Sequence, residues 1–467
     1  MAITTCRYRT PGKGISLFHR EGQVHAGVTM TAEIVIMNRE AVAIAADSAV
    51  SLMGRRGDRP QKIFTSGNKI FELSRKHTAC IMVYNNGNFM GIPWSTIITF
   101  YRQHLGDRTF ATLREYGDHF IRFLSVEKEF VPSKAEENYF VTRVYNQFLF
   151  IRYLIQQNAT VLMRQKGAIS EEEIQEIAVQ VVTGIYEKLQ AAEFSPSMDS
   201  TVQEELRTAF AETIDKAIKE VFQNLPIPAE IAQKLGEIAL LFIVKSPEGM
   251  DPAGDDFSGV VITGFGDRDI FPSIRSFQIE GRIANHLKYR EVGSQEISLE
   301  NGASIVPLAQ REMVDIFLSG MDPRFEQALL GSLFRTFHAF HETIIDSIEK
   351  LDDAEKTALK EKFSGVSNEL VQQLQAQLQN YRLFNANPIV NVVASLPKAD
   401  LASMAESLVN LTALKRRVSL EAETVGGPAD VAVISKSDGF IWVKKKQYFK
   451  PLLNMQETLP EVSADVP

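Results

Sequence analysis

Between residues 31 and 91, short apolar runs alternate with turn residues. AEIVIM and AVAIAAD are separated by NRE, and KIFELS and TACIMVY follow after stretches that contain glycine and asparagine. Runs of four to eight apolar and β-branched residues bounded by turn residues are typical of strands. This region is therefore predicted to begin a two-layer β core.

Helical periodicity replaces the strand pattern at Pro93, a residue suited to the first turn of a helix. Apolar side chains then recur at the spacing of one helix face, at Trp94, Ile97, Ile98 and Tyr101. The pattern continues with interruptions at proline-containing segments. It predicts a helical insertion over about residues 93–245.

Strand character returns at FSGVVITGFG and FPSIRSFQIEGRI, and a second helical insertion is predicted over about residues 322–386. Its segment LVQQLQAQLQNY has the heptad-like spacing of a helix that pairs with another helix. DLASMAESLVNLTALKRRVS is predicted to be the last helix. The segment VGGPADVAVISKSDGFIWVKKK is predicted to be a hairpin that turns at residues 437–439. Together these elements predict the α+β class.

Composition narrows the class of protein. Apolar residues make up 45% of the 467 positions and charged residues 23%, which is typical of a folded globular chain. A net charge of −8 argues against a nucleic-acid or anionic-membrane partner, because those surfaces attract clustered lysine and arginine. Two cysteines cannot form a disulfide framework, and no apolar run approaches the roughly 18 residues of a membrane helix. We expect a cytoplasmic protein without membrane segment, metal or cofactor.

Thr31 stands at the start of the first predicted strand, directly after Met30. A threonine that is the first residue of a chain is both nucleophile and base. Its hydroxyl attacks a carbonyl, and its own α-amine, with a reference pKa near ~8, accepts the proton. This chemistry requires that residues 1–30 be absent. We therefore interpret residues 1–30 as an extension or propeptide and residues 31–467 as a single domain.

The order of these segments resembles the catalytic half of proteasome β subunits and of the HslV-type bacterial protease. A strand is followed by a turn, a second strand ending in Ala-Ala-Asp, a Lys-Ile-Phe and an apolar strand; Thr31 and Asp47 have the family's separation of sixteen residues. Near the C-terminus, a helix, a Gly-Gly and DVAVIS resemble the family's last helix and strand. The resemblance implies a four-layer αββα sandwich of the N-terminal-nucleophile (Ntn) hydrolase type, with two large helical insertions.

The resemblance also implies site residues. Thr31 would be the nucleophile, and Asp47 would hold a lysine whose positive charge eases formation of the alkoxide. That lysine is Lys69 or Lys62. We prefer Lys69 because the alternation after it continues into the next strand, whereas Lys62 fits the family's loop length better. The backbone N–H of Asn85 would bind the oxyanion, and asparagine tolerates unusual backbone angles.

In the family, two serines and an acid orient the terminal amine. Ser319 in FLSG matches the first serine. The acid would be Glu421 or Glu423, and Thr424 would replace the second serine. The segment EAETVGG departs from the family here, because it lacks the expected Ser-Gly-Gly.

The function implied is that of a threonine-type endopeptidase acting on peptide or protein substrates. Two alternatives remain open: an Ntn amidase acting on a small metabolite, and a non-catalytic, proteasome-like scaffold subunit. Family members form rings, so a homo-oligomer is expected, while an ATPase partner cannot be inferred from the sequence. The simplest route to a terminal Thr31 is translation from Met30 followed by removal of the methionine. Autocatalytic loss of a propeptide is the competing hypothesis.

Two other sequence patterns are weaker indications of a functional site. Ser66 and Lys69 spell the S-x-x-K of penicillin-binding hydrolases, but the K-T-G strand of those enzymes is missing. His338, His341 and Glu342 share one helix face, which we interpret as solvated surface rather than a metal site.

Overall fold

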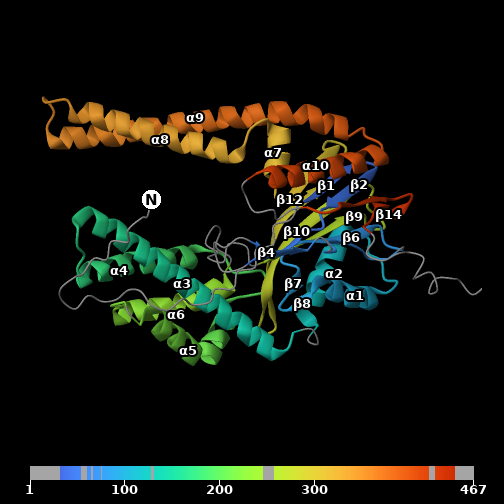
Figure 1. Cartoon of the computed structure of the whole chain (residues 1–467), viewed down its shortest axis with the longest axis horizontal. Helices are drawn as coiled ribbons and strands as arrows, with labels where there is room; N and C mark the ends of the chain where they lie inside the picture. The colour runs from blue at the N-terminus through green and yellow to red at the C-terminus, as the bar shows by residue number, and fades with distance from the viewer. Residues whose placement is uncertain are drawn as a thin grey trace, which may run out of the picture.

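The computed structural model describes residues 32–53, 60–64, 67–74, 76–127, 131–223, 225–245, 257–419 and 426–446. Over these residues the chain has the mixed α+β architecture that the sequence predicts, and its strands pair antiparallel (Figure 1).

The strands form two five-stranded sheets. The first sheet has the order β12-β1-β2-β13-β14, with bounds β12 Ala303–Ala309, β1 Ala32–Asn38, β2 Ala41–Ala46, β13 Asp430–Ser435 and β14 Gly439–Lys444. The second sheet has the order β11-β10-β9-β6-β5, with bounds β11 His286–Glu296, β10 Ser273–Ile283, β9 Ser258–Gly264, β6 Ala79–Asn85 and β5 Ile70–Glu72. Short hairpins pair β3 (Val50–Met53) with β4 (Pro60–Phe64), and β7 (Asn88–Phe89) with β8 (Ile92–Pro93).

The two sheets pack face to face around a shared apolar core. Side chains of β1 and β2, such as Val35 and Ile44, meet side chains of β6 and β9, such as Met82 and Val261. The opposite face of the first sheet is covered by helices α7 (Glu312–Ser319), α9 (Asp353–Val393) and α10 (Lys398–Val418). Because both faces of β1 and β2 are buried, their sequences read as continuous apolar runs.

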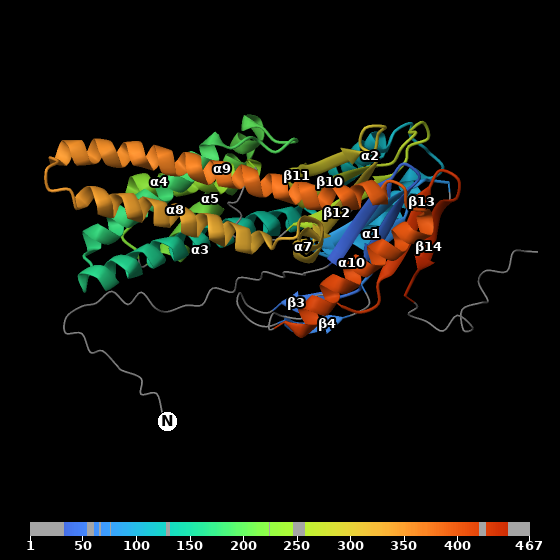
Figure 2. The same ribbon diagram turned by 90° about the horizontal axis from the view of Figure 1, so that it is seen from above.

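The predicted insertion at residues 93–245 has two parts in the structure. Its first helices, α1 (Trp94–Leu105) and α2 (Leu113–Val126), pack on the outer face of the second sheet. The later helices form a bundle with its own core, with bounds α3 Ser133–Lys166, α4 Glu171–Ala191, α5 Ser200–Phe222 and α6 Ala229–Val244. Figures 1 and 2 show this bundle extending away from the sheets.

The second helical block is a hairpin. Helix α8 (Pro323–Asp346) runs back along α9, and both views show the pair projecting from the sheets (Figures 1 and 2). The predicted pairing of the heptad-like segment is confirmed. The interpretation of His341 as solvated surface is wrong, because His341 is buried beside Ser367 of α9, with 3.3 Å between Nδ1 and Oγ. None of the described helices has the length and apolar character needed to span a membrane.

Local sequence sets several helix starts. Helices α2, α4 and α9 begin with capping boxes, at Thr112, Ser170 and Asp352. In a capping box, the side chain of a Ser, Thr or Asp and that of a glutamate three residues later each accept the backbone N–H of the other residue. The hairpin β10–β11 turns through Ala284 and Asn285, which both have positive φ values, of 49° and 64°. This is the backbone of a two-residue turn matched to the twist of the strands.

Buried charges attach the α3–α6 bundle to the second sheet. The guanidinium of Arg282, at the end of β10, is buried and donates to Glu136 Oε1 at 2.7 Å. It also donates to the carbonyls of Glu127 and Val131, at 2.7 and 2.9 Å. Arg282 thus fixes the segment that leads into α3.

We expect Arg282→Met to lower the free energy of unfolding by about 3 kcal/mol, because it leaves the Glu136 carboxylate, which is only 12% exposed, without its cation. Urea denaturation followed by circular dichroism measures the change. The matched control is Arg207→Met in α5, whose pair with Glu237 is partly exposed and is expected to contribute no more than ~1 kcal/mol. Equal losses in the two variants would contradict the role of Arg282.

Candidate active site

Asp47 lies at the end of β2, beside the start of β1, and its carboxylate collects hydrogen bonds from separate segments. Oδ1 accepts the backbone N–H of Ala32 at 3.0 Å. Oδ2 accepts the N–H groups of Ala49 and Gly426, at 3.2 and 2.9 Å. The side chain is 1% exposed. These donors fix its position and compensate its charge.

Lys69 brings its ammonium group to this carboxylate from the second sheet. It precedes β5, and its carbonyl accepts the N–H of Val83 of β6 at 2.9 Å. Its Nζ, on a side chain that is 7% exposed, forms an ion pair with Asp47 Oδ1. The structure therefore brings Asp47 and Lys69 together. Lys62 lies in β4, and its side chain is outside the described part of the chain.

Glu33 is a second carboxylate on Lys69. Its Oε1 lies 3.3 Å from Lys69 Nζ, and its side chain is 0% exposed. The sequence reasoning did not identify Glu33. The available signal was a single charged residue inside the apolar run AEIVIM, because a charge in a buried strand requires a partner.

A second buried ion pair adjoins the first. Lys446 Nζ lies 2.7 Å from Asp430 Oδ2, and both side chains are 4% exposed. The same Nζ donates to the carbonyl of Gly67, two residues before Lys69. Asp430 pairs with Ala46, the residue before Asp47, in the β13–β2 register. This pair was also missed, because only the fold brings its members to Asp47.

The environment of Lys446 affects its charge. Burial lowers the pKa of the Lys446 ammonium, and the positive charge of Lys69 acts in the same direction. The carboxylates of Asp430 and Asp47 oppose this shift. The pair of Asp430 and Lys446 thus interacts electrostatically with the adjoining pair of Asp47 and Lys69, which Glu33 also contacts.

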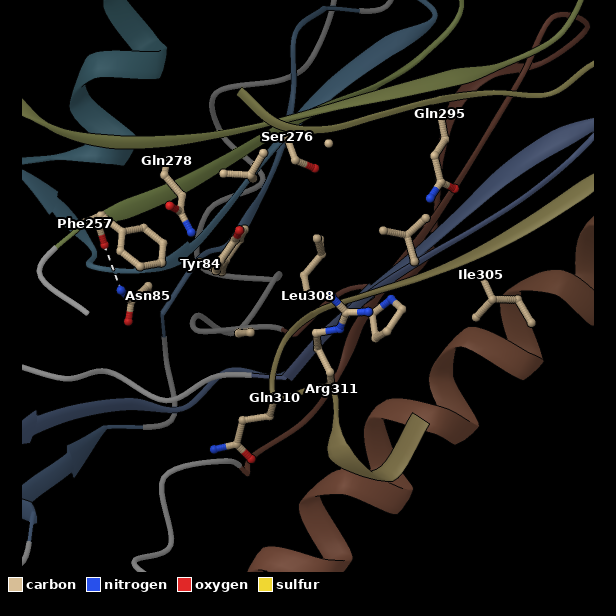
Figure 3. A pocket seen from close by; sticks show the side chains of 15 residues that line it. Tyr84, Asn85, Phe257, Ser276, Gln278, Gln295, Ile305, Leu308, Gln310 and Arg311 are labelled. Carbon is tan, nitrogen blue, oxygen red and sulfur yellow. Dashed lines mark hydrogen bonds between the residues drawn. The ribbon is translucent and has the colours of Figure 1, made fainter. Parts of the chain in front are cut away.

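Asn85 ends β6 with a φ of 66°, a left-handed conformation uncommon for a residue other than glycine. Its Nδ2 donates to the carbonyl of Phe257 at 2.9 Å, which holds the side chain in place (Figure 3). Backbone outliers of this kind concentrate at functional sites. Asn85 and its neighbour Tyr84 both line a cavity.

The cavity has a volume of about 520 Å³ and lies where the edge strands β12 and β11 meet the end of β6. Its wall includes residues 305–311, and Ala309 pairs with Ala32 in the β12–β1 register. The cavity therefore adjoins the start of β1, close to the cluster around Lys69. Its size is within the range of small-ligand sites.

Tyr84 connects the cavity with the buried charges. Its ring lies over Gly259 of β9, where an added Cβ would overlap it. Burial raises the pKa of the Tyr84 hydroxyl to about 12; the negative charge of Glu33 adds to this shift and Arg311 opposes it. Tyr84 therefore keeps its proton at neutral pH and presents a hydroxyl to the cavity.

Among the described residues no hydrogen bond joins Ser319 to Asp47 or Lys69, and Thr31, whose amine Ser319 is predicted to orient, lies outside them. Ser319 is the last residue of α7, and its Oγ lies 2.6 Å from the carbonyl oxygen of Asp315 and 3.0 Å from that of Met321, which share its one proton. Asn385 of α9 donates to its carbonyl at 3.0 Å. In the described part of the chain, these contacts cap a helix.

Four of the predicted positions, Thr31, Glu421, Glu423 and Thr424, lie outside the described residues. Among the residues that are described, no group of three histidine, cysteine or acidic side chains is arranged to hold a metal ion. No protein-family model matches the chain, and no curated protein matches it either.

We expect Lys69→Met to lower the free energy of unfolding by about 3–5 kcal/mol, because it leaves Asp47 and Glu33 as adjacent buried carboxylates. The control is Lys76→Met, whose ion pair with Asp107 is largely exposed, so the expected change is below ~1 kcal/mol. Adding Glu33→Gln to Lys69→Met should recover part of the loss. Additive losses in the double variant would contradict the proposed coupling.

Proposed function

We propose that the protein is a threonine-type Ntn hydrolase that cleaves peptide bonds, with Thr31 as nucleophile. The observation that carries the proposal is the buried Asp47–Lys69 ion pair beside the first residue of β1. A lysine held in this place supplies a fixed positive charge where the sequence predicts a terminal threonine hydroxyl.

The layers of the molecule support the same proposal. Two antiparallel sheets stack on each other, with helices α7, α9 and α10 outside one sheet and α1 and α2 outside the other. This is the order of layers that an αββα Ntn sandwich requires. On this proposal, α3–α6 and α8–α9 are elaborations of the sandwich.

In the proposed mechanism, the Thr31 hydroxyl attacks the carbonyl carbon of the scissile bond while its proton passes to the Thr31 α-amine. The ammonium of Lys69 stabilises the developing alkoxide, and the backbone N–H of Asn85 donates to the oxyanion. The terminal ammonium then protonates the leaving amine, which gives an ester on Thr31. Water, deprotonated by the same amine, hydrolyses the ester and restores the threonine.

Thr31→Ala is expected to abolish both peptide hydrolysis and labelling by an electrophilic peptide inhibitor, because the variant has no nucleophilic hydroxyl. The protein is expressed from Met30, and intact mass establishes that Thr31 is the first residue. Thr31→Ser is the matched control and should keep measurable labelling. Labelling that persists in Thr31→Ala, in a protein with an unchanged circular dichroism spectrum, would refute the proposal.

Glu33→Gln is expected to move the acid limb of the pH–rate profile to lower pH. A negative charge near the terminal amine favours the ammonium form, which cannot accept a proton; its removal leaves more neutral amine at a given pH. The expected shift is roughly one pH unit, which corresponds to ~1.4 kcal/mol of interaction between the removed charge and the ammonium form.

The control for this experiment is Glu280→Gln. It removes a carboxylate on β10 that pairs with Arg143 of α3 and Lys288 of β11, where the α3–α6 bundle meets the second sheet. It should leave the midpoint of the acid limb unchanged. If Glu33→Gln lowers the rate equally at every pH, Glu33 has only a structural role.

A further inference from the structure

The cavity next to the cluster carries one charged side chain among the fifteen described residues that line it, that of Arg311. Arg311 is 63% exposed, and its ion pair with Asp315 is long, at 3.8 Å. Within the described part of the chain its guanidinium makes no hydrogen bond. A guanidinium has five N–H donors and no acceptor, so Arg311 offers donors to a ligand.

Two glutamine amides in the wall are oriented by their partners. Arg290 Nη2 donates to Gln278 Oε1 at 2.6 Å, and Ser304 Oγ donates to Gln295 Oε1. Because arginine only donates, the assignment of the Gln278 oxygen is fixed. The Gln278 amide therefore presents its NH₂ group as a donor, and the Gln295 amide does the same with its oxygen on Ser304 Oγ.

The hydroxyl of Ser276 and the protonated hydroxyl of Tyr84 add further donors to the wall. No aspartate or glutamate is among its described lining residues. Figure 3 shows Gln278, Gln295 and Arg311 around the cavity. The wall is therefore positively charged and rich in donors, which suits a ligand that carries negative charge and acceptor oxygens.

We propose that this cavity binds the side-chain carboxylate of the substrate residue that precedes the scissile bond, with Arg311 as the residue that selects for acidic side chains. The proposal rests on the proposed function, which supplies the scissile bond at the start of β1. The preferred substrates are peptides cleaved after glutamate or aspartate.

The test uses three fluorogenic peptides that differ only in glutamate, glutamine or leucine before the scissile bond. A charge-assisted hydrogen bond predicts a kcat/KM for the glutamate peptide about tenfold or more above that for the glutamine peptide. Arg311→Gln should remove this difference, so that the ratio of kcat/KM for the glutamate and glutamine peptides falls to about one. The matched control is Arg324→Gln, a similarly exposed arginine on α8 outside the cavity, which should keep the preference.

Equal cleavage of the glutamate and glutamine peptides, with dependence on Thr31 intact, would overturn this inference and leave the proposed function standing. Thr31-independent cleavage, or none of any peptide, would overturn the proposed function. Calorimetric binding of the three peptides to Thr31→Ala then decides the inference without turnover. Tighter binding of the glutamate peptide, lost on Arg311→Gln, supports it, and equal affinities overturn it.

Discussion

The ammonium group of Lys69 is the charge on which the buried end of the two sheets depends. It reaches from the second sheet to two carboxylates of the first, Asp47 and Glu33, in a region almost without solvent. Either carboxylate alone at this depth would be strongly unfavourable, and the lysine makes both tolerable. In the proposed mechanism, the same charge stabilises the alkoxide that forms on Thr31. Stability and proposed reactivity therefore rest on one interaction.

The strands around this ion pair have different roles. The continuous apolar strands β1 and β2, buried on both faces, hold Asp47 and Glu33 in register. The edge strands β11 and β12 provide the wall of the cavity, where polar side chains face space large enough for a ligand. The helical bundle and the α8–α9 hairpin extend from this frame (Figure 2). The central strands thus position the buried charges, and the edge strands supply the polar side chains that line the cavity.

Sequence patterns predicted the elements that are strongly apolar or strongly periodic, and they missed β11 and β12. Both are edge strands, and edge strands tolerate the charges of KYREV and the proline of ASIVPLA that obscure the strand pattern. Asp47 and Lys69 could be paired in advance because the resemblance assigns a lysine to Asp47, and the apolar alternation after Lys69 favoured it over Lys62. Glu33 and Lys446 could not, because their partners are set by side-chain direction and by contacts between residues as far apart as Gly67 and Lys446.

The hydrogen bonds of Asp47 also determine when the buried charge cluster can form during synthesis of the chain. Its carboxylate accepts the N–H of Gly426, and Asp430 and Lys446 stand next to it on β13 and after β14. A ribosome delivers these residues after the strands β1 to β12 of the described chain. A nascent chain that lacks them has an incomplete charge cluster and a first sheet that ends at β2. The charge cluster around Lys69 can therefore be complete only after β13, β14 and Lys446 have been made.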